Sequence, residues 1–353
     1  MKGLNQNWKY IILLLLFLFI SYLSLVAVYH IASDQSSFLS LGIFSKGLFL
    51  KLAILLIVYF TTDMLRFYYV LKSIDVTVPL KHMLSLAFIN IFVSNITPSA
   101  TGGGFAQIYL LNKRGVSIGA ATAGSSIRTA LPILFFSICT PLILIFNHNI
   151  ERIFPNRNMG VYVLVMLGFD LVAIWIVTKL LRHPETIVLM ITKIKRVFLK
   201  RGKREDGKLI HFLDKLIQET DLFSHHFMMY LHGNKKYVLL SIFYTFVFLF
   251  SLFLIPYLLI QDLNTQVSLT DIVLSQIVIT TVMYFAPTPG AAGVAEAAFV
   301  TLFSSYVSQS HIVSVTFAWR LFSIYIGMII GLLVFYVQII KKHELIEVPQ
   351  NEA

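Results

Sequence analysis

The fold is decided by the stretch Ile96-Thr97-Pro98-Ser99-Ala100-Thr101-Gly102-Gly103-Gly104, which interrupts a long apolar region. A helix breaks here, because proline removes a backbone donor and glycine has a large ordering cost. At membrane depth, broken backbone is tolerated only where protein or a water-filled cavity satisfies its polar groups. The stretch therefore predicts a helix break that faces protein or a polar cavity.

A second stretch of the same kind is Pro287-Thr288-Pro289-Gly290-Ala291-Ala292-Gly293-Val294-Ala295-Glu296. When the two are aligned on their shared Thr-Pro, Ser99 matches Gly290. Each stretch precedes an apolar segment with one arginine, Arg128 or Arg320. The offsets from the aligned prolines are 30 (128 − 98) and 31 (320 − 289). This paired spacing predicts an internal repeat, and the alternative is a pair of unrelated helix kinks.

Composition places the chain in a membrane. Of its 353 residues, 57% are hydrophobic and 13% are charged, and the mean hydropathy is +0.80. Soluble domains carry about 25% charged residues. The net charge of +11 does not indicate nucleic-acid binding, because basic residues of a membrane protein gather on cytoplasmic loops and near anionic headgroups. The single cysteine, Cys139, excludes an internal disulfide and a cysteine-based metal cluster, and we expect neither a metal nor a cofactor.

Basic flanks predict the topology of the first repeat, residues 1–150. Lys2 and Lys9 precede an apolar span at residues 10–30, which places the N-terminus in the cytoplasm. We expect this span to be a retained helix and not a cleaved signal peptide. The repeat continues with a span at 48–71, a re-entrant hairpin at 82–112 that enters from inside, and a span at 117–147 that carries Arg128.

The second repeat, residues 151–353, starts from the outside. Its expected segments are a span at 160–181, a basic cytoplasmic segment at 182–236, a span at 237–261, a re-entrant hairpin at 270–307 and a last span at 311–340. The C-terminus is then cytoplasmic. The basic segment contains amphipathic helices, which either lie on the inner leaflet or form a solvated connector that packs on the membrane domain.

These segments define the expected fold class. It is an all-α integral membrane protein, a polytopic helical bundle with two re-entrant Pro/Gly-broken hairpins in an inverted-topology repeat. Transporters with inverted repeats hold their substrate at the repeat interface, near the middle of the bilayer. The expected location is the inner cell membrane.

The two intramembrane arginines are the main candidates for chemistry. A buried arginine costs at least about 2.5 kcal/mol on insertion scales and normally faces a cavity or a partner. Its planar fork suits phosphate, and the free N–H groups of a new half-helix also bind anions. The candidate lipid-phosphate set is Arg128, Arg320, Ser99, Thr101, Gly102, Gly103, Gly104, Gly290 and Gly293. The alternative is a structural ion pair, in which Glu296 is the expected partner of Arg320 or Arg128.

Other polar residues lie outside this set, and Asp63, Asp170 and Glu296 are candidate structural or coupling carboxylates. Asp63 lies three residues before Arg66, so the two either pair locally or line an inner vestibule. Asp170 lies inside the span at 160–181, as a proton-coupling carboxylate or as a structural contact. Polar residues also flank the two hairpins and suggest a polar interior: Asn90, Asn95, Gln107, Tyr109, Asp271 and Gln276.

The two breaks and the arginines that follow them resemble the lysylphosphatidylglycerol synthase transmembrane (flippase-like) family. That family includes the membrane domain of the bacterial multiple peptide resistance factor MprF. The resemblance covers nearly the whole chain and implies a multi-span fold with re-entrant helices that moves a modified phospholipid, such as lysyl-phosphatidylglycerol, between leaflets. By matching motif it favours Gly293, Glu296 and Arg320 as site residues, with Gly102 to Gly104 and Arg128 next.

The chain ends at Ala353, 12 residues beyond Lys341 (353 − 341). We therefore expect no aminoacyl-transferase domain, which makes a lysyltransferase activity doubtful. No Gly-Lys-Ser/Thr follows the glycine run, so no P-loop and no direct use of ATP are expected.

Two functions compete at this point. The first is a flippase or transporter for a phospholipid or a polyprenyl-phosphate lipid, with membrane phospholipids as its partners. The second is a membrane subunit or enzyme of lipid modification that acts with a separate lipid synthase, where Glu296 is the one carboxylate placed as a general base. A plain assembly partner and a homo-oligomer also fit the sequence.

Overall fold

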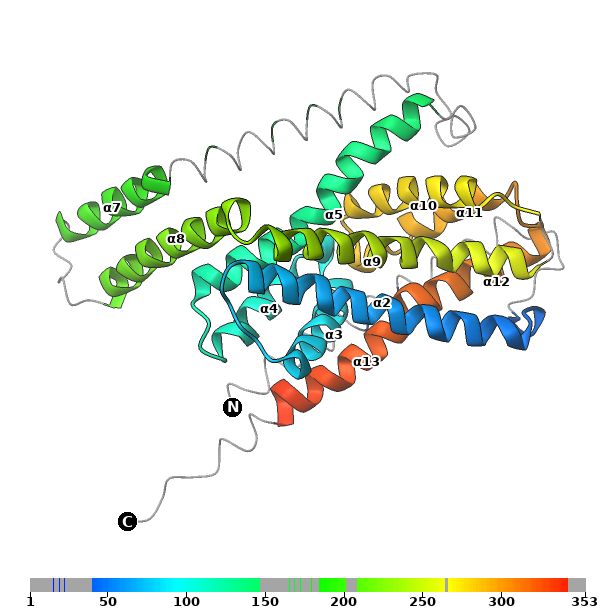
Figure 1. The fold of residues 1–353 in the computed structure, drawn as a ribbon, viewed down its shortest axis with the longest axis horizontal. Coiled ribbons are helices and arrows are strands. Elements are labelled where there is room, and N and C mark those ends of the chain that lie inside the picture. The colour runs from blue at the N-terminus through cyan, green and yellow to red at the C-terminus, as the bar shows by residue number, and fades with distance from the viewer. Residues whose placement is uncertain are drawn as a thin grey trace, which may run out of the picture.

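The structure is a computed structural model that describes residues 40–146, 184–200, 208–263 and 266–341, with isolated positions between 15 and 22 and between 165 and 179. The regular structure of these ranges is helical throughout (Figure 1). The chain is thus an all-helical, polytopic membrane protein. The expected spans at 10–30 and 160–181, Asp170 and both chain termini fall outside the described residues, apart from those isolated positions.

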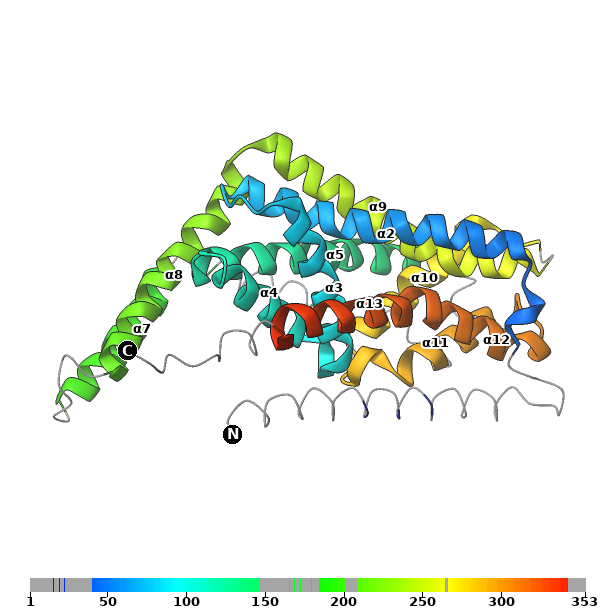
Figure 2. The same ribbon diagram turned by 90° about the horizontal axis from the view of Figure 1, so that it is seen from below.

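Four helices within the described ranges are long and apolar enough to cross a membrane. They are α2 (Lys46–Ser73), α5 (Ile118–Phe146), α9 (Lys235–Asp262) and a composite helix at Gln309–Gln338. Each coincides with an expected span. Helices α2 and α9 lie side by side along most of their length (Figures 1 and 2), where Tyr59 stacks on Phe248 with ring centroids 4.9 Å apart. A short 3-10 turn, η1 (Leu41–Ile43), precedes α2.

The last span, expected at 311–340, is not a single continuous α-helix. It consists of α12 (Gln309–Arg320), a π-turn η5 (Leu321–Tyr325), α13 (Ile326–Phe335) and a second π-turn η6 (Tyr336–Lys341). A π-turn adds a residue to the helical turn and rotates everything beyond it. The first one begins directly after Arg320, so it changes which side chains face the interior there.

Both predicted breaks are present, and they share two consecutive residues with a left-handed backbone. The first joins α3 (Leu80–Ile96) to α4 (Gly102–Asn112) through η2 (Pro98–Ala100). The second joins α10 (Leu269–Tyr284) to α11 (Val294–Phe303) through η4 (Pro289–Ala291). The aligned residues Ser99 and Gly290 have φ values of 52° and 56°. The next aligned pair, Ala100 and Ala291, has φ 54° at both positions, and η2 contacts η4.

The glycine run lets the two arms of the first break lie close together. A Cβ atom on Gly103 would collide with the side chains of Ser94 and Asn90 on α3. The backbone N–H of Gly102 donates to Oγ1 of Thr97 at 2.9 Å, so this threonine satisfies the first free donor of α4. Helix α4 therefore folds back along α3 directly after the break.

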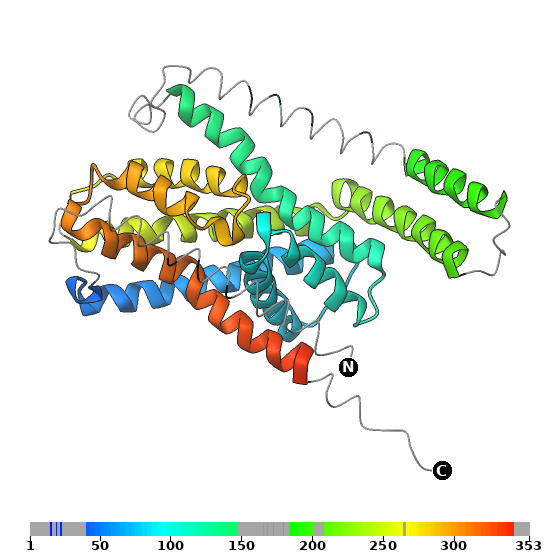
Figure 3. The same ribbon diagram turned by 180° about the vertical axis from the view of Figure 1, so that it is seen from behind.

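The basic segment forms two helices, α7 (Pro184–Lys200) and α8 (Lys208–His232). They pack on each other with an ion pair of 2.6 Å between Lys195 and Asp214, and they extend beyond one end of the bundle (Figures 1 and 3). Helix α8 packs on α5, where the carboxylate of Glu219 accepts a 2.6 Å hydrogen bond from the N–H of Gly119. For α8 this contact matches the expected connector that packs on the membrane domain.

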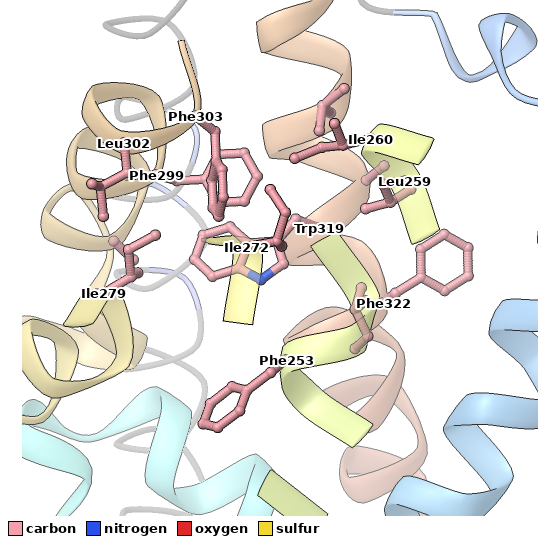
Figure 4. Close-up of a cluster of buried hydrophobic side chains, with 14 of the residues drawn as sticks. Phe253, Leu259, Ile260, Ile272, Ile279, Phe299, Leu302, Phe303, Trp319 and Phe322 are labelled. Atoms are coloured by element: carbon pink, nitrogen blue, oxygen red, sulfur yellow. The ribbon is translucent and has the colours of Figure 1, made fainter. Parts of the chain in front are cut away.

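An aromatic core holds the second break against the last span. Trp319 stacks on Phe299 with centroids 4.5 Å apart, and Phe299 contacts Phe303 at the same distance. Figure 4 shows Trp319 in the middle of this cluster, between side chains of α11 and α9. Helix α12, which carries Arg320, is therefore held in place because the adjacent Trp319 packs against side chains of α9 and α11.

Candidate functional site

Three charged side chains meet in the interior of the bundle. Asp63 and Arg66 lie one turn apart on α2, and Arg128 reaches them from α5; all three are buried. Nη2 of Arg128 donates to Oδ1 and Oδ2 of Asp63 at 2.8 and 2.9 Å. Nε of Arg66 donates to Oδ1 of Asp63 at 2.7 Å. One carboxylate thus serves two guanidinium groups, and we call these three residues the charge cluster.

The charge cluster carries one positive charge in excess, because two arginines share a single aspartate. Nη1 of Arg66 and Nε of Arg128 are buried and have no hydrogen-bond partner among the described residues. The guanidinium of Arg66 lies 4.0 Å from the ring centroid of Phe248, which contributes a favourable cation–π contact. An uncompensated buried charge is costly. The cluster is therefore suited to receive an anion.

A cavity of about 270 Å³ opens beside the charge cluster. Helices from both halves of the chain line it, and its polar lining beyond the cluster consists of Tyr59, Asn90, Ser94, Asn95, Thr129, Gln276, Thr280, Tyr284 and Ser323. Oε1 of Gln276 is a buried acceptor without a partner in the described structure. The side chain of Tyr284 is 45% exposed, so it marks where the cavity meets the surface of the protein. The cavity can take a small polar group with both charge and hydrogen-bonding capacity.

The second arginine has a different environment. Arg320 is 0% exposed, and its Nε donates to Oε1 of Glu296 at 2.6 Å while its Nη2 donates to the carbonyl of Gly290 at 2.9 Å. The other oxygen of Glu296, Oε2, accepts from the N–H of Gly293 at 2.7 Å. Of the two partners expected for Glu296, it pairs with Arg320 and joins α12 to the second break, while Arg128 pairs with Asp63. Trp319 lines the cavity but Arg320 does not.

The structure divides the predicted site residues into two groups. Arg128, Asp63 and Gly104 line the cavity. The remaining described candidates are not in its lining: Ser99, Thr101, Gly102, Gly103, Gly290, Gly293, Glu296 and Arg320. At the start of α11 the carboxylate of Glu296 already occupies the N–H group of Gly293 that was expected to bind an external anion. At the start of α4, Gly104 brings the helix N-terminus to the cavity wall.

Thr280 and Tyr284 line the cavity but were not predicted, whereas Gln276 was expected only as part of a polar interior. These three residues follow one another at intervals of four on α10. Because residues four apart share a helix face, this polar stripe in an apolar helix was a readable signal. Arg66 was expected either to pair with Asp63 or to line an inner vestibule; in the structure it pairs with Asp63 and also lines the cavity. No group of three or more His, Cys, Asp or Glu side chains in the described ranges could hold a metal ion.

Fold and site together define a polytopic helical membrane protein with a buried, positively charged cavity. The sequence model of the family described as "Lysylphosphatidylglycerol synthase TM region" matches residues 7–331, and the chain belongs to this family. The chain is also similar to a UPF0104 membrane protein of Archaeoglobus fulgidus. The two are 22% identical over 262 residues, which cover 74% of this chain and 77% of that protein.

Proposed function

We propose that the protein moves a phospholipid between the two leaflets of the cell membrane and holds the lipid phosphate in the cavity beside Asp63, Arg66 and Arg128. The observation that carries this proposal is the uncompensated positive charge of the cluster, which lines a cavity among membrane-length helices. Guanidinium groups bind phosphate through two parallel hydrogen bonds and stay charged at any physiological pH. A phosphodiester carries one negative charge, which balances the excess charge of the cluster.

The family description supports a lipid as the substrate, and lysyl-phosphatidylglycerol is the first candidate. Its phosphodiester would contact the two arginines. Its headgroup donors would face acceptors of the lining, among which Oε1 of Gln276 and Oγ of Ser323 are buried and have no hydrogen-bond partner within the described residues. The acyl chains would stay in an apolar environment throughout. A separate lipid synthase would supply the modified lipid.

The mechanism that we propose is alternating exposure of the cavity to the two leaflets. In it, the segments at 80–112 and 269–303 are re-entrant hairpins, and the two halves of the chain form an inverted repeat with both termini in the cytoplasm. The matching φ values of Ser99 with Gly290 and of Ala100 with Ala291 support this relationship. In the proposed movement the two breaks, which contact each other through η2 and η4, slide on each other.

In this mechanism the two halves have different tasks. The Glu296–Arg320 pair is fully buried and internally satisfied except for Nη1 of Arg320, so it keeps the second break rigid. The first break carries no carboxylate at the aligned position, which is Phe105, an exposed residue. We therefore assign phosphate binding to the charge cluster and a structural role to Arg320.

The test is lipid translocation in proteoliposomes, with fluorescent phosphatidylglycerol and its lysylated form. We would compare the unmodified protein with Arg66→Gln and Arg128→Gln. Each variant leaves Asp63 paired with the remaining arginine, so the fold is expected to survive. Arg114→Gln is the matched control, because Arg114 is a partly buried arginine outside the cavity lining. Loss of translocation in both cavity variants but not in the control supports the proposal, and translocation that survives both substitutions overturns it.

A further inference from the structure

An apolar groove of about 510 Å³ lies next to the cavity. Its lining comes from four helices: Leu55 and Val58 of α2, Phe135 of α5, seven residues of α9 from Phe246 to Leu254, and Val273 and Ile277 of α10. Ser251 is the one polar residue in this described lining, and its hydroxyl donates to the carbonyl of Val247 at 2.7 Å. The groove therefore presents hydrocarbon surface without a free polar side chain. Val58, Phe246 and Phe250 are among its exposed residues.

The groove and the cavity share a wall. Leu249 lines both. On α2 the cavity residue Tyr59 directly follows the groove residue Val58, and on α10 the cavity residue Gln276 directly precedes the groove residue Ile277. The two spaces are therefore adjacent, one polar and charged and the other apolar.

The groove is displaced from the cavity toward one end of the bundle. Helix α2 runs antiparallel to α5, because Asp63 contacts Arg128 while Leu71 lies beside Gly124. On α2 the groove residue Leu55 precedes the cavity residues. On α5 the groove residue Phe135 follows the last cavity residue, Pro132. Both differences point to the end where α2 begins and α5 ends, which is opposite to α8.

We propose that the groove holds one acyl chain of the same lipid whose phosphate lies at the charge cluster. This inference rests on the proposed function and adds the position and direction of the tail. A lipid with its phosphate in the cavity needs an apolar space for its acyl chain, and the groove is an apolar space that adjoins the cavity at Leu249. The headgroup lies toward the α8 end and the tail toward the end where α2 begins. With α8 in the cytoplasm, this is the orientation of a lipid of the inner leaflet.

The test uses tryptophan fluorescence and brominated lipids in reconstituted bilayers. Phe250→Trp places the fluorophore in the groove, and Phe243→Trp is the matched control on the same helix outside it. The two positions are similarly exposed, at 47% and 57%. Bromine on the acyl chains quenches a nearby indole, so phosphatidylglycerol and diacylglycerol with the same brominated chains compare lipids with and without the phosphate. The fluorescence of the unmodified protein is subtracted.

We expect phosphatidylglycerol to occupy the groove about tenfold more readily than diacylglycerol in Phe250→Trp, since a charge-assisted contact holds its phosphate. This preference for phosphatidylglycerol disappears when Arg66→Gln is added. Phe243→Trp shows no such preference, with or without Arg66→Gln. If Phe250→Trp shows no preference while the protein still translocates lipid, the groove is not the tail site and the proposed function stands. If cavity substitutions leave translocation intact, the phosphate site itself fails. Equal preference at Phe250→Trp and Phe243→Trp also overturns the inference, because it reports general lipid contact.

Discussion

Asp63 and Arg128 are 65 residues apart in the chain, yet the guanidinium of Arg128 donates to both carboxylate oxygens of Asp63 at 2.8 and 2.9 Å. This double contact joins α2 to α5 in the interior of the bundle. Arg66 uses the same carboxylate from one turn away. The three residues are therefore unequal: removal of either arginine leaves a balanced pair, whereas removal of the aspartate leaves two buried positive charges.

The first prediction follows from that inequality. Asp63→Asn is expected to lower the free energy of unfolding by about 3–5 kcal/mol, because it leaves buried guanidinium groups without a counter-charge. Arg66→Gln is expected to cost less than about 2 kcal/mol, since it removes one hydrogen bond and the contact with Phe248. Thermal unfolding in detergent, monitored by the fraction of protein that stays monodisperse, measures the difference. Equal losses for the two substitutions would contradict the cluster as described.

The second prediction concerns Glu296 and Arg320. Arg320→Met alone is expected to destabilise the protein by about 3–5 kcal/mol, because Glu296 remains buried and charged beside the second break. Adding Glu296→Gln should recover most of this stability, since both charges are then absent. A double-mutant cycle on the unfolding temperature measures the coupling. If the double variant regains stability but does not translocate lipid, Arg320 acts on the lipid and not only on the fold.

Much of this fold can be predicted from the sequence, because unsatisfied backbone polar groups are costly inside a membrane and helix breaks there need special residues. Pro98 and Pro289 with their glycines predicted both breaks, and the apolar runs predicted the four described spans. The Asp63–Arg128 contact was not predicted, because membrane helices are apolar on most faces and their pattern does not fix which face meets which neighbour. The π-turn after Arg320 was also missed, since no proline or glycine marks it.

The third prediction compares the two breaks. Ser99 has a left-handed backbone with φ 52°, and its aligned partner Gly290 has φ 56°. Such a conformation costs a non-glycine residue roughly 1–2 kcal/mol. Ser99→Gly is therefore expected to stabilise the protein by up to about 1 kcal/mol, and Gly290→Ser to destabilise it by about 1–2 kcal/mol. Unfolding temperatures of the two variants test this pair. If Ser99→Gly lowers the unfolding temperature, the contacts of the serine side chain stabilise the protein by more than its left-handed backbone costs.

The fourth prediction is a pH dependence of the contact between α8 and the bundle. Nδ1 of His226 donates to the carbonyl of Ile74 at 3.2 Å in the neutral tautomer. Burial lowers the pKa of His226 below its usual value of 6.5, and the neighbouring His225 lowers it further. The unfolded segment then binds more protons than the folded one between the lowered pKa and 6.5. The docked state of α8 is therefore fully stable above pH 6.5 and loses stability as the pH falls below it.

Hydrogen exchange of α8 amides, normalised to α9 in the same sample, should rise on acidification. His226→Gln keeps a donor and cannot titrate, so its ratio should stay flat, while His211→Gln on the same helix should behave like the unmodified protein. A ratio that rises equally in His226→Gln would assign the pH dependence to another group.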